Sequence, residues 1–376
     1  MALFCFILSI NNVIFALHMG IDDVKQLERE SKKRNTLYFA ALGILFFVLI
    51  LSFFFALLID SSGLEFLDML KGLFRVGSKK ANIIIGNIRL RRVIASLLVG
   101  TGLTLSGAIM QYCLNNPMAS PSTLGVSEAA TFGATIALVI FSSGNFSSNT
   151  VLSITNPYLV STCSFIMALI AILIVLFLSK FKGFSPSTVA LCGIALGGLF
   201  SSLTAIVQYF SSDSNVASTV YWTFGDLSRP SFLQLGIMAV IIIPSIIIFL
   251  ILSRRINALM EGEEVAKSLG IRTNLLRFIC LLLASLICAV TVSFVGIIGF
   301  IGLVVPQIVS RLIGDNASKS LPLTALIGSI SMLLLDTLSR ILVRGTNLPV
   351  GSLTTLIGAP VFIYILLTSR RQSKWN

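Results

Sequence analysis

Residues 275–298 form the run LLRFICLLLASLICAVTVSFVGII, which decides the fold class of this chain. A helix needs roughly 20 mostly apolar residues to cross the hydrocarbon core of a bilayer, and this run is long enough. Further clear runs of similar composition lie at 36–59, 157–179, 188–210, 233–253 and 350–368. The sequence therefore predicts a membrane protein with several spanning helices.

Weaker apolar runs, interrupted by glycine, serine and other polar residues, lie at 90–112, 122–141, 300–313 and 322–342. Such residues are typical of a helix that packs on other helices or lines a cavity, whereas a helix facing lipid all round does not need them. Taking both kinds of run together, we expect an all-α integral membrane protein of about ten transmembrane helices.

The composition excludes an ordinary soluble domain. Hydrophobic residues make up 56% of the 376 residues and charged residues only 11%, whereas a soluble domain carries about 25% charged residues. The net charge of +12 does not indicate a nucleic-acid partner, because the basic residues lie in short clusters between apolar runs. Clusters of this kind orient membrane helices and meet membrane lipid, since Lys and Arg stay on the cytoplasmic side.

An even number of spans puts both chain ends on one side, which we predict to be the cytoplasm. The segments on that side then hold 17 of the 27 basic residues. The predicted domains are a cytoplasmic segment at 1–35, a transmembrane domain at 36–370 and a cytoplasmic tail at 371–376. Residues 1–18 either lie at the membrane interface or precede a translation start at Met19, because the stretch is apolar but lacks the basic start of a signal peptide.

The segment 254–277 is the longest interior hydrophilic stretch on the predicted cytoplasmic side. Residues 257–269 predict a short helix whose glutamates lie three or four residues before Lys267. Gly262 and Gly270 permit tight turns around it. The pattern is typical of a docking element for a partner, or of a solvated loop that merely joins two spans.

Small residues and chain breaks characterise the segment 88–126. One helical face carries small residues, which permit close approach of backbones: Gly100, Gly102, Ser106 and Gly107. The break at 115–117, Asn-Asn-Pro, must be buried in protein or line a wet cavity if it lies within the membrane. The motif GIALG at 193–197 predicts a second close-packing face.

Two ionisable residues, Asp336 and Arg340, lie four positions apart near the predicted outer end of a span. Ionisable residues inside spans are costly and commonly functional, so this pair either has a role or neutralises itself locally. Seven further basic residues fall on the predicted outer side within 71–92.

Several chemical signatures are missing from the sequence. It has no G-x-x-x-x-G-K-[ST] motif, a single histidine (His18) and no C-x-x-C pair. We therefore expect no P-loop nucleotide site, no metal site, no cofactor and no catalytic residues.

Seven strings follow one another along the chain: IRLRRVIASLLVG, MQYCLNNPMASPSTLGV, LCGIALGGLFSSLTA, YWTFGDLS, NALMEGEEVAKSLGI, GFIGLVVPQIVSRLIG and LLLDTLSRILVRGTNLPVGSLTTLIGAPVFIYIL. In this order they resemble the permeases of ferric-siderophore, haem and vitamin B12 ABC importers, often called the FecCD family. The resemblance covers roughly 36–370 and implies the fold of a vitamin B12 importer permease.

The resemblance also implies partners and a mechanism. A permease of this family pairs with an identical or paralogous subunit, binds two cytoplasmic ATPase subunits and receives cargo from an extracytoplasmic binding protein. Cargo crosses between the permease subunits by alternating access. In the family, outer arginines meet carboxylates of the binding protein, and the matching positions are Arg89, Arg92 and Arg340, with Asp336 holding Arg340. Arginine suits this role because its planar fork binds a carboxylate bidentately.

The family's coupling helices fall on 257–270. The resemblance assigns ATPase coupling to Asn257, Leu259, Gly262, Glu263, Glu264, Ala266, Leu269 and Gly270. The expected translocation path includes the span at 188–210 and the residues Gly102, Ser106, Gln111, Asn115, Asn116 and Pro117. The chain departs from the family pattern at Glu261, Gln307 and Arg91, where leucine, histidine and proline are usual. Glu261 changes one docking contact, Gln307 keeps hydrogen bonding but cannot take a charge, and Arg91 adds a charge beside the docking arginines.

The alternative function is an ion-gradient-coupled secondary transporter. Such proteins often show inverted repeats and a carboxylate in mid-membrane. This sequence shows no obvious repeat and few acids within its spans, chiefly Glu128 and Asp336. A membrane enzyme fits less well, because no catalytic constellation is found.

Overall fold

The computed structural model describes residues 21–58, 76, 78–141, 144–146, 152–154, 156–181, 184–343 and 348–368. The chain has two compact units, residues 1–47 and 48–376. The helix α2 (Ile21–Leu58) runs through the boundary between the units. The predictions for residues 1–18 and for the tail at 371–376 lie outside the described residues, and the predicted domain boundary at residue 35 stays a prediction.

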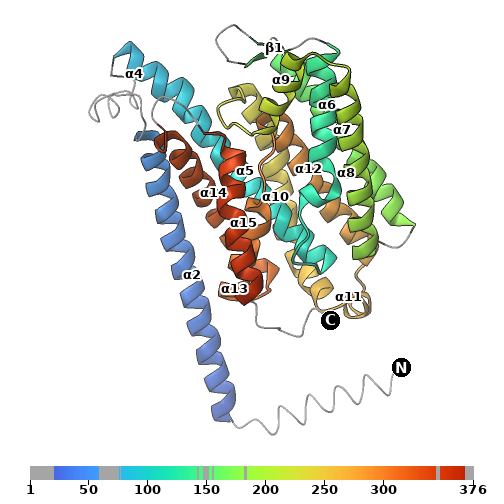
Figure 1. Ribbon diagram of the computed structural model, residues 1–376. Coiled ribbons are helices and arrows are strands. Elements are labelled where there is room, and N and C mark those ends of the chain that lie inside the picture. Colours follow the sequence, from blue (N-terminus) through green and yellow to red (C-terminus); the bar gives the residue numbers. More distant parts are fainter. Residues whose placement is uncertain are drawn as a thin grey trace. The chain divides into compact units, whose positions relative to one another are not determined.

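Most of the described chain is helical (Figure 1). Eight helices in the described residues are long and apolar enough to cross a membrane, and α6 and α13 are shorter apolar helices. After α2, the apolar helices are α5 (Leu90–Leu114), α6 (Val126–Val139), α7 (Pro157–Lys180), α8 (Pro186–Tyr209), α10 (Phe232–Met260), α12 (Thr273–Val295), α13 (Ile301–Ile313), α14 (Ala317–Ile341) and α15 (Val350–Thr368). This architecture confirms the predicted multi-spanning all-α fold.

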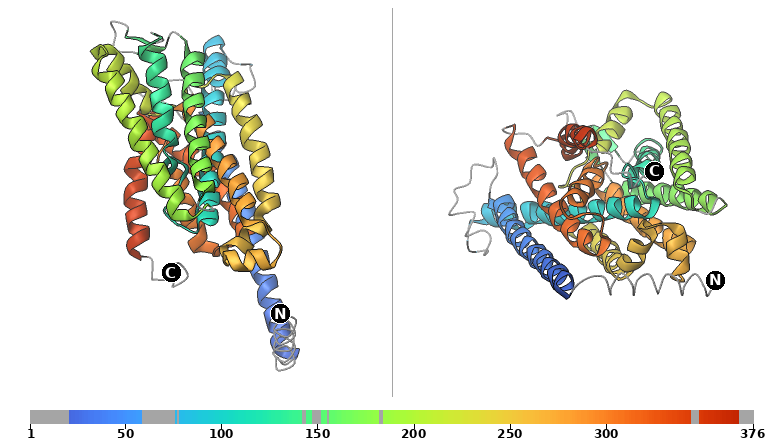
Figure 2. Two further views of the ribbon diagram at one scale, coloured as in Figure 1. Left: turned by 90° about the vertical axis from the view of Figure 1, so that its right-hand side faces the viewer. Right: turned by 90° about the horizontal axis from the view of Figure 1, so that it is seen from below.

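Short elements connect these helices. They are α4 (Lys79–Ile83), the π-helix η1 (Ile84–Arg89), the 3-10 helix η2 (Pro121–Leu124), α9 (Asp213–Thr223), α11 (Glu263–Ser268) and the strands β1 (Gly144–Phe146) and β2 (Leu152–Ile154). The strands pair antiparallel, with Gly144 opposite Ile154. The turn helix α11 lies at one end of the helical bundle, and α9 and the strands lie at the other (Figures 1 and 2). We call these the α11 end and the α9 end.

Local sequence signals explain where three spans begin. Asn156 and Ser185 each accept a hydrogen bond from a backbone N–H in the first turn of α7 and α8, and a proline follows each cap. At α10, Ser231 and Gln234 form a reciprocal capping box. These caps satisfy donors at helix ends that would otherwise lack partners.

The helix α5 is the centre of the 48–376 unit, where it packs against α10, α12, α13 and α14. In its most apolar stretch 78% of the residues are buried, against 28% for α8. Small residues permit this packing, because a Cβ on Gly100 would lie only 2.5 Å from the carbonyl oxygen of Gly328. A second group, α6 with α7 and α8, adjoins it through α12.

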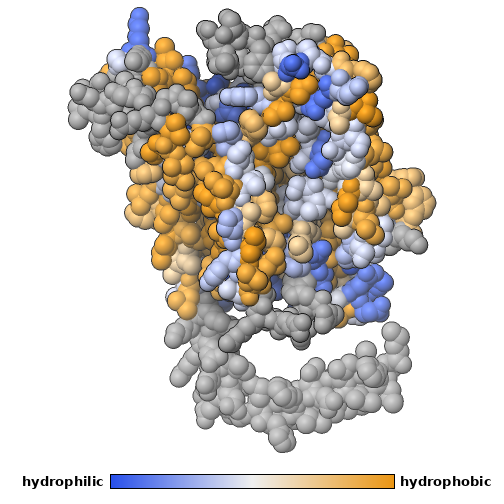
Figure 3. All heavy atoms as spheres, in the orientation of Figure 1, coloured by the Kyte–Doolittle hydropathy of each residue, from blue (hydrophilic) through white to orange (hydrophobic). Residues whose placement is uncertain are grey.

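Apolar side chains cover large areas of the outer surface of the helices, as the space-filling view shows (Figure 3). Val240 and Ile251 of α10, for example, are exposed. Soluble monomers rarely expose apolar areas of this extent, and such areas are suited to lipid or to a partner subunit. The protein is therefore a multi-pass membrane protein, as predicted.

Candidate functional site

The first candidate site is the α11 turn, residues 261–272, which joins α10 to α12. Gly262 separates α10 from α11 and has a φ of 131°, and Gly270 has a φ of 75°. Side-chain-bearing residues rarely adopt such backbone angles, so glycine is needed at both turns. The two predicted glycine turns are confirmed. The single helix predicted over 257–269 was wrong, because Gly262 divides it.

Two ion pairs of Glu263 stabilise the α11 turn, and the pair with Arg277 also holds it against α12. The Glu263 carboxylate accepts a hydrogen bond from Lys267 at 2.9 Å and from the guanidinium of Arg277 at 2.8 Å. Together these cations hold the pKa of Glu263 below its ordinary value, and the Lys267 contact is the larger cause. The pairing with Lys267 was predicted from its spacing, whereas Arg277 comes from the next helix.

Three of the predicted coupling residues serve the packing of the chain itself. Leu259 and Ala266 are buried. The side-chain oxygen of Asn257 accepts a hydrogen bond of 2.7 Å from the backbone N–H of Ala317. Since Ala317 begins α14, Asn257 supplies a cap to that helix from the end of α10.

Other positions of the α11 turn form an exposed surface. Glu264 and Gly270 are exposed, and the apolar side chains of Val265 and Leu269 are 45% and 66% exposed. Leu269 also borders a cavity of about 340 Å³ whose walls include Arg255 and Arg272. An apolar tip beside a basic hollow has the chemistry of a protein-docking surface.

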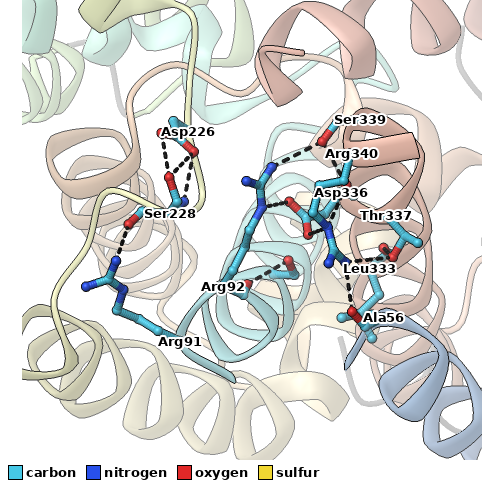
Figure 4. A network of polar contacts seen from close by, with 11 residues as sticks. Ala56, Arg91, Arg92, Asp226, Ser228, Leu333, Asp336, Thr337, Ser339 and Arg340 are labelled. Atoms are coloured by element: carbon cyan, nitrogen blue, oxygen red, sulfur yellow. Dashed lines mark hydrogen bonds and ion pairs between the residues drawn. The ribbon is translucent and has the colours of Figure 1, made fainter. Parts of the chain in front are cut away.

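The second candidate site is an arginine cluster at the α9 end, and its side chains are buried. Asp336 lies between two arginines (Figure 4): Arg92 Nε is 2.6 Å from Oδ1, and Arg340 Nε is 3.3 Å from Oδ2. The expected contact between Asp336 and Arg340 is thus present. Arg340 also donates to the carbonyl oxygen of Ala56 at 2.9 Å, and Arg89 donates to that of Leu57 at 2.8 Å.

These contacts give the cluster a structural role. Arg89 and Arg340 both bind carbonyl groups in the last turn of α2, where helical acceptors lack partners and positive charge is favourable. Asp336 compensates two positive charges inside the protein. The cluster therefore joins α2, α5 and α14, and the docking of a binding protein at Arg89, Arg92 and Arg340 stays a prediction.

Two nearby arginines also contact the chain. Arg91 is partly buried and donates to the carbonyl oxygen of Ser228 at 3.0 Å. Arg229 lies over the ring of Trp222 and donates to two backbone carbonyl groups. Burial lowers the pKa of Arg229 from its ordinary value, partly offset by Asp226. Sequence patterns did not single out Arg229, because its partners lie in other turns of the chain.

Three predicted path residues, Gly102, Ser106 and Gln111, are buried by neighbouring helices. The Ser106 hydroxyl donates to the Ala284 carbonyl oxygen, and Gln111 accepts a hydrogen bond of 2.9 Å from Gln307. This face of α5 therefore packs against other helices in the described structure. The other three, Asn115, Asn116 and Pro117, lie in the turn after α5, where Asn115 is exposed and Asn116 and Pro117 are half-buried.

The turn after α5 leads to a cavity beside α8. Gly193 and Gly197 pack closely against the backbone of residues 123–125, which confirms the second predicted close-packing face. The adjoining cavity of about 390 Å³ is lined by Ser122 and Thr123 of η2, by Glu128 of α6, and by Ile194 and small residues of α8. An opening of this kind fits the expected path along 188–210 better than the packed face of α5 does.

Several known proteins are similar to this chain in sequence. The model of the FecCD transport family matches residues 48–368. An ABC transporter permease protein of Methanocaldococcus jannaschii, MJ0087, is 42% identical over 86% of this chain and 93% of its own. The Fe(3+)-citrate import system permease protein YfmE of Bacillus subtilis is 34% identical over 76% of this chain and 84% of its own.

A solved structure has the same fold. It is described as an inward-facing conformation of a metal-chelate type ABC transporter and matches with a TM-score of 0.74 and 31% sequence identity. The match covers 87% of this chain and 98% of the other.

Proposed function

The chain belongs to the FecCD transport family and is a permease subunit of that kind of ABC importer, and we propose that it carries a ferric chelate into the cytoplasm by alternating access. The observation that carries the proposal is the family match, which extends from the second half of α2 to the end of α15. The Fe(3+)-citrate permease and the metal-chelate type transporter among the similar proteins support an iron chelate as cargo.

The proposed assembly contains two permease subunits, identical or paralogous, and two ATPase subunits. Each ATPase would grip one α11 turn through the exposed tip at Val265 and Leu269. The exposed face of α8 would line the path between the permease subunits, together with the turn at 115–125. Two observations support this arrangement: the low burial of α8 and the cavity between α8 and η2.

Purification from native membranes in mild detergent tests the proposal. Mass spectrometry is expected to find an ATPase subunit that carries a P-loop, and the purified assembly in liposomes is expected to import a ferric chelate only when ATP is present. If no ATPase accompanies the permease, and uptake follows an ion gradient without ATP, the secondary-transporter alternative replaces this proposal.

Leu269→Glu is expected to weaken ATPase binding by roughly 30-fold, because a charge in an apolar contact costs about 2 kcal/mol or more. The affinity of the purified ATPase for the permease in nanodiscs measures this effect. Leu312→Glu is the matched control, since Leu312 is 71% exposed but lies in α13 outside the α11 turn. Equal affinities for the two variants would contradict the assignment of Leu269 to the docking surface.

Delivery of cargo by a binding protein is also part of the proposal. An incoming carboxylate would engage Arg92 or Arg340 only by displacing Asp336, whereas Arg91 and Lys79 are more accessible at the same end. Arg91→Glu is therefore expected to slow association of the binding protein by roughly tenfold at low salt, because surface charge governs the rate of encounter. Association rates on permease nanodiscs measure it.

Arg254→Glu provides the control for this measurement, because it makes the same charge change on an exposed residue at the α11 end of the helical bundle. An association rate that falls equally in both variants would show that net charge, and not contact near Arg91, determines the effect.

A further inference from the structure

A buried arginine connects the α11 turn to the central helix. Arg277 lies in the first turns of α12, and its side chain is only 9% exposed. One arm of its guanidinium donates to Glu263 of α11 at 2.8 Å. Its Nε donates to the carbonyl oxygen of Cys113, in the last turn of α5, at 3.2 Å. The planar fork of arginine suits this double contact, because its donors point in fixed and different directions.

The end of α5 that Arg277 contacts determines where the following turn lies. Carbonyl groups in the last turn of a helix lack helical partners and attract positive charge, so Arg277 holds that turn electrostatically as well as by a hydrogen bond. Asn115 closes α5 in a left-handed conformation. The chain then runs to η2, where Ser122 and Thr123 line the cavities of about 200 Å³ and 390 Å³.

The two partners of Glu263 differ in what they connect. Lys267 is 54% exposed and lies on α11 itself, so its ion pair stays within the turn. Arg277 is buried and reaches another helix, so a displacement of Glu263 pulls directly on the end of α5. Among the described side-chain contacts of α11, the contact of Glu263 with Arg277 is the one that connects the α11 turn to α5.

We propose that Arg277 is a positioning residue that transmits movement of the α11 turn to the last turn of α5 and so to the turn at 115–125. This inference rests on the proposed function, in which an ATPase moves the α11 turn. Loss of Arg277 then leaves ATP hydrolysis intact but separates it from movement at the cavity beside α8.

The test uses the complete transporter, with its ATPase and binding protein, in liposomes, and measures ATP hydrolysed per chelate imported. Arg277→Gln is expected to raise this ratio by about tenfold or more, because it removes the hydrogen bond to the Glu263 carboxylate and the hydrogen bond to the carbonyl oxygen of Cys113. Lys267→Gln is the matched control, because it removes the other ion pair of Glu263 and leaves the contact with α5. We expect its ratio to stay close to that of the unchanged protein.

An unchanged ratio in Arg277→Gln, with the ATPase still bound, would overturn the inference. Failure of the unchanged protein to bind an ATPase or to import chelate with ATP is a different result, which overturns the proposed function itself. Arg277→Lys provides a second measurement if Arg277→Gln does not fold, since lysine keeps the charge but lacks the fork.

A spin label at the exposed Met118 position, with Cys5, Cys163 and Cys192 replaced by serine, reports movement of the turn after α5. ATP is expected to change the spectrum of the label when Arg277 is present, and to change it less when the labelled protein also carries Arg277→Lys. Equal changes in both, or no change in the unchanged protein, would also overturn the inference.

Discussion

Asp336→Ala is expected to lower the free energy of unfolding by about 3–5 kcal/mol, because it leaves buried positive charge without a partner. Asp336 is fully buried and contacts both Arg92 and Arg340, which are themselves 3–4% exposed. Removal of one arginine would leave Asp336 with the other, whereas removal of Asp336 affects both. The change at Asp336 is therefore the most damaging single substitution in the cluster.

Equilibrium unfolding in mixed micelles measures this loss, and the yield of folded protein from membranes provides an independent estimate. Asp315→Ala is the matched control, since Asp315 is exposed in the turn between α13 and α14. We expect it to change the free energy of unfolding by less than about 0.5 kcal/mol, as surface substitutions usually do. A small loss in both variants would show that water or lipid headgroups compensate the buried arginines.

The positions of the apolar helices followed from the sequence because burial in lipid requires long apolar runs. Among the described residues, eight of the ten predicted runs form helices long enough to span a membrane, and α6 and α13 are shorter. The predicted run at 233–253 shows the limit of this argument. In the structure α10 continues to Met260, since a helix does not end where the hydrocarbon ends. Its backbone hydrogen bonds persist through Arg254 and Arg255 until Gly262 ends them.

The candidate sites were predictable only within one helical turn. A spacing of four residues predicts the contacts of Glu263 with Lys267 and of Asp336 with Arg340. The stronger contact of Asp336 is with Arg92, which lies 244 residues away, and the cap that Asn257 provides to Ala317 spans 60 residues. Only the packing of helices brings such pairs together, so no local pattern signals them.

Small residues in α5 had two open interpretations, close packing or the lining of a wet cavity. The structure shows packing: a Cβ on Gly107 would overlap the carbonyl oxygen of Gly302 in α13. A Cβ on Gly302 would lie 2.6 Å from the carbonyl oxygen of Leu103. The sequence alone cannot distinguish the two cases, because both need a helix face without bulk.

Gly107→Ala is accordingly expected to destabilise the protein by about 3 kcal/mol or more, at or above the upper end of overpacking effects. The added methyl group meets backbone atoms of α13, which do not rotate away as a side chain does. The two helices must separate, and this breaks the hydrogen bonds that join Gln111 to Leu303 and to Gln307. The free energy of unfolding, measured in mixed micelles, and the rate of ATP-driven uptake are both expected to fall.

Gly236→Ala is the matched control for this prediction. Gly236 also lies inside a spanning helix, but an added Cβ meets nothing within 4 Å. Alanine is the better helix former by roughly 1 kcal/mol, so this variant is expected to be as stable as the unchanged protein or slightly more stable. If Gly107→Ala and Gly236→Ala have the same free energy of unfolding, the close contact of α5 with α13 is absent from the folded protein. In that case the face of α5 that carries small residues is again a candidate lining of the translocation path. The residues that permit close contact between α5 and α13 also leave space when the two helices separate.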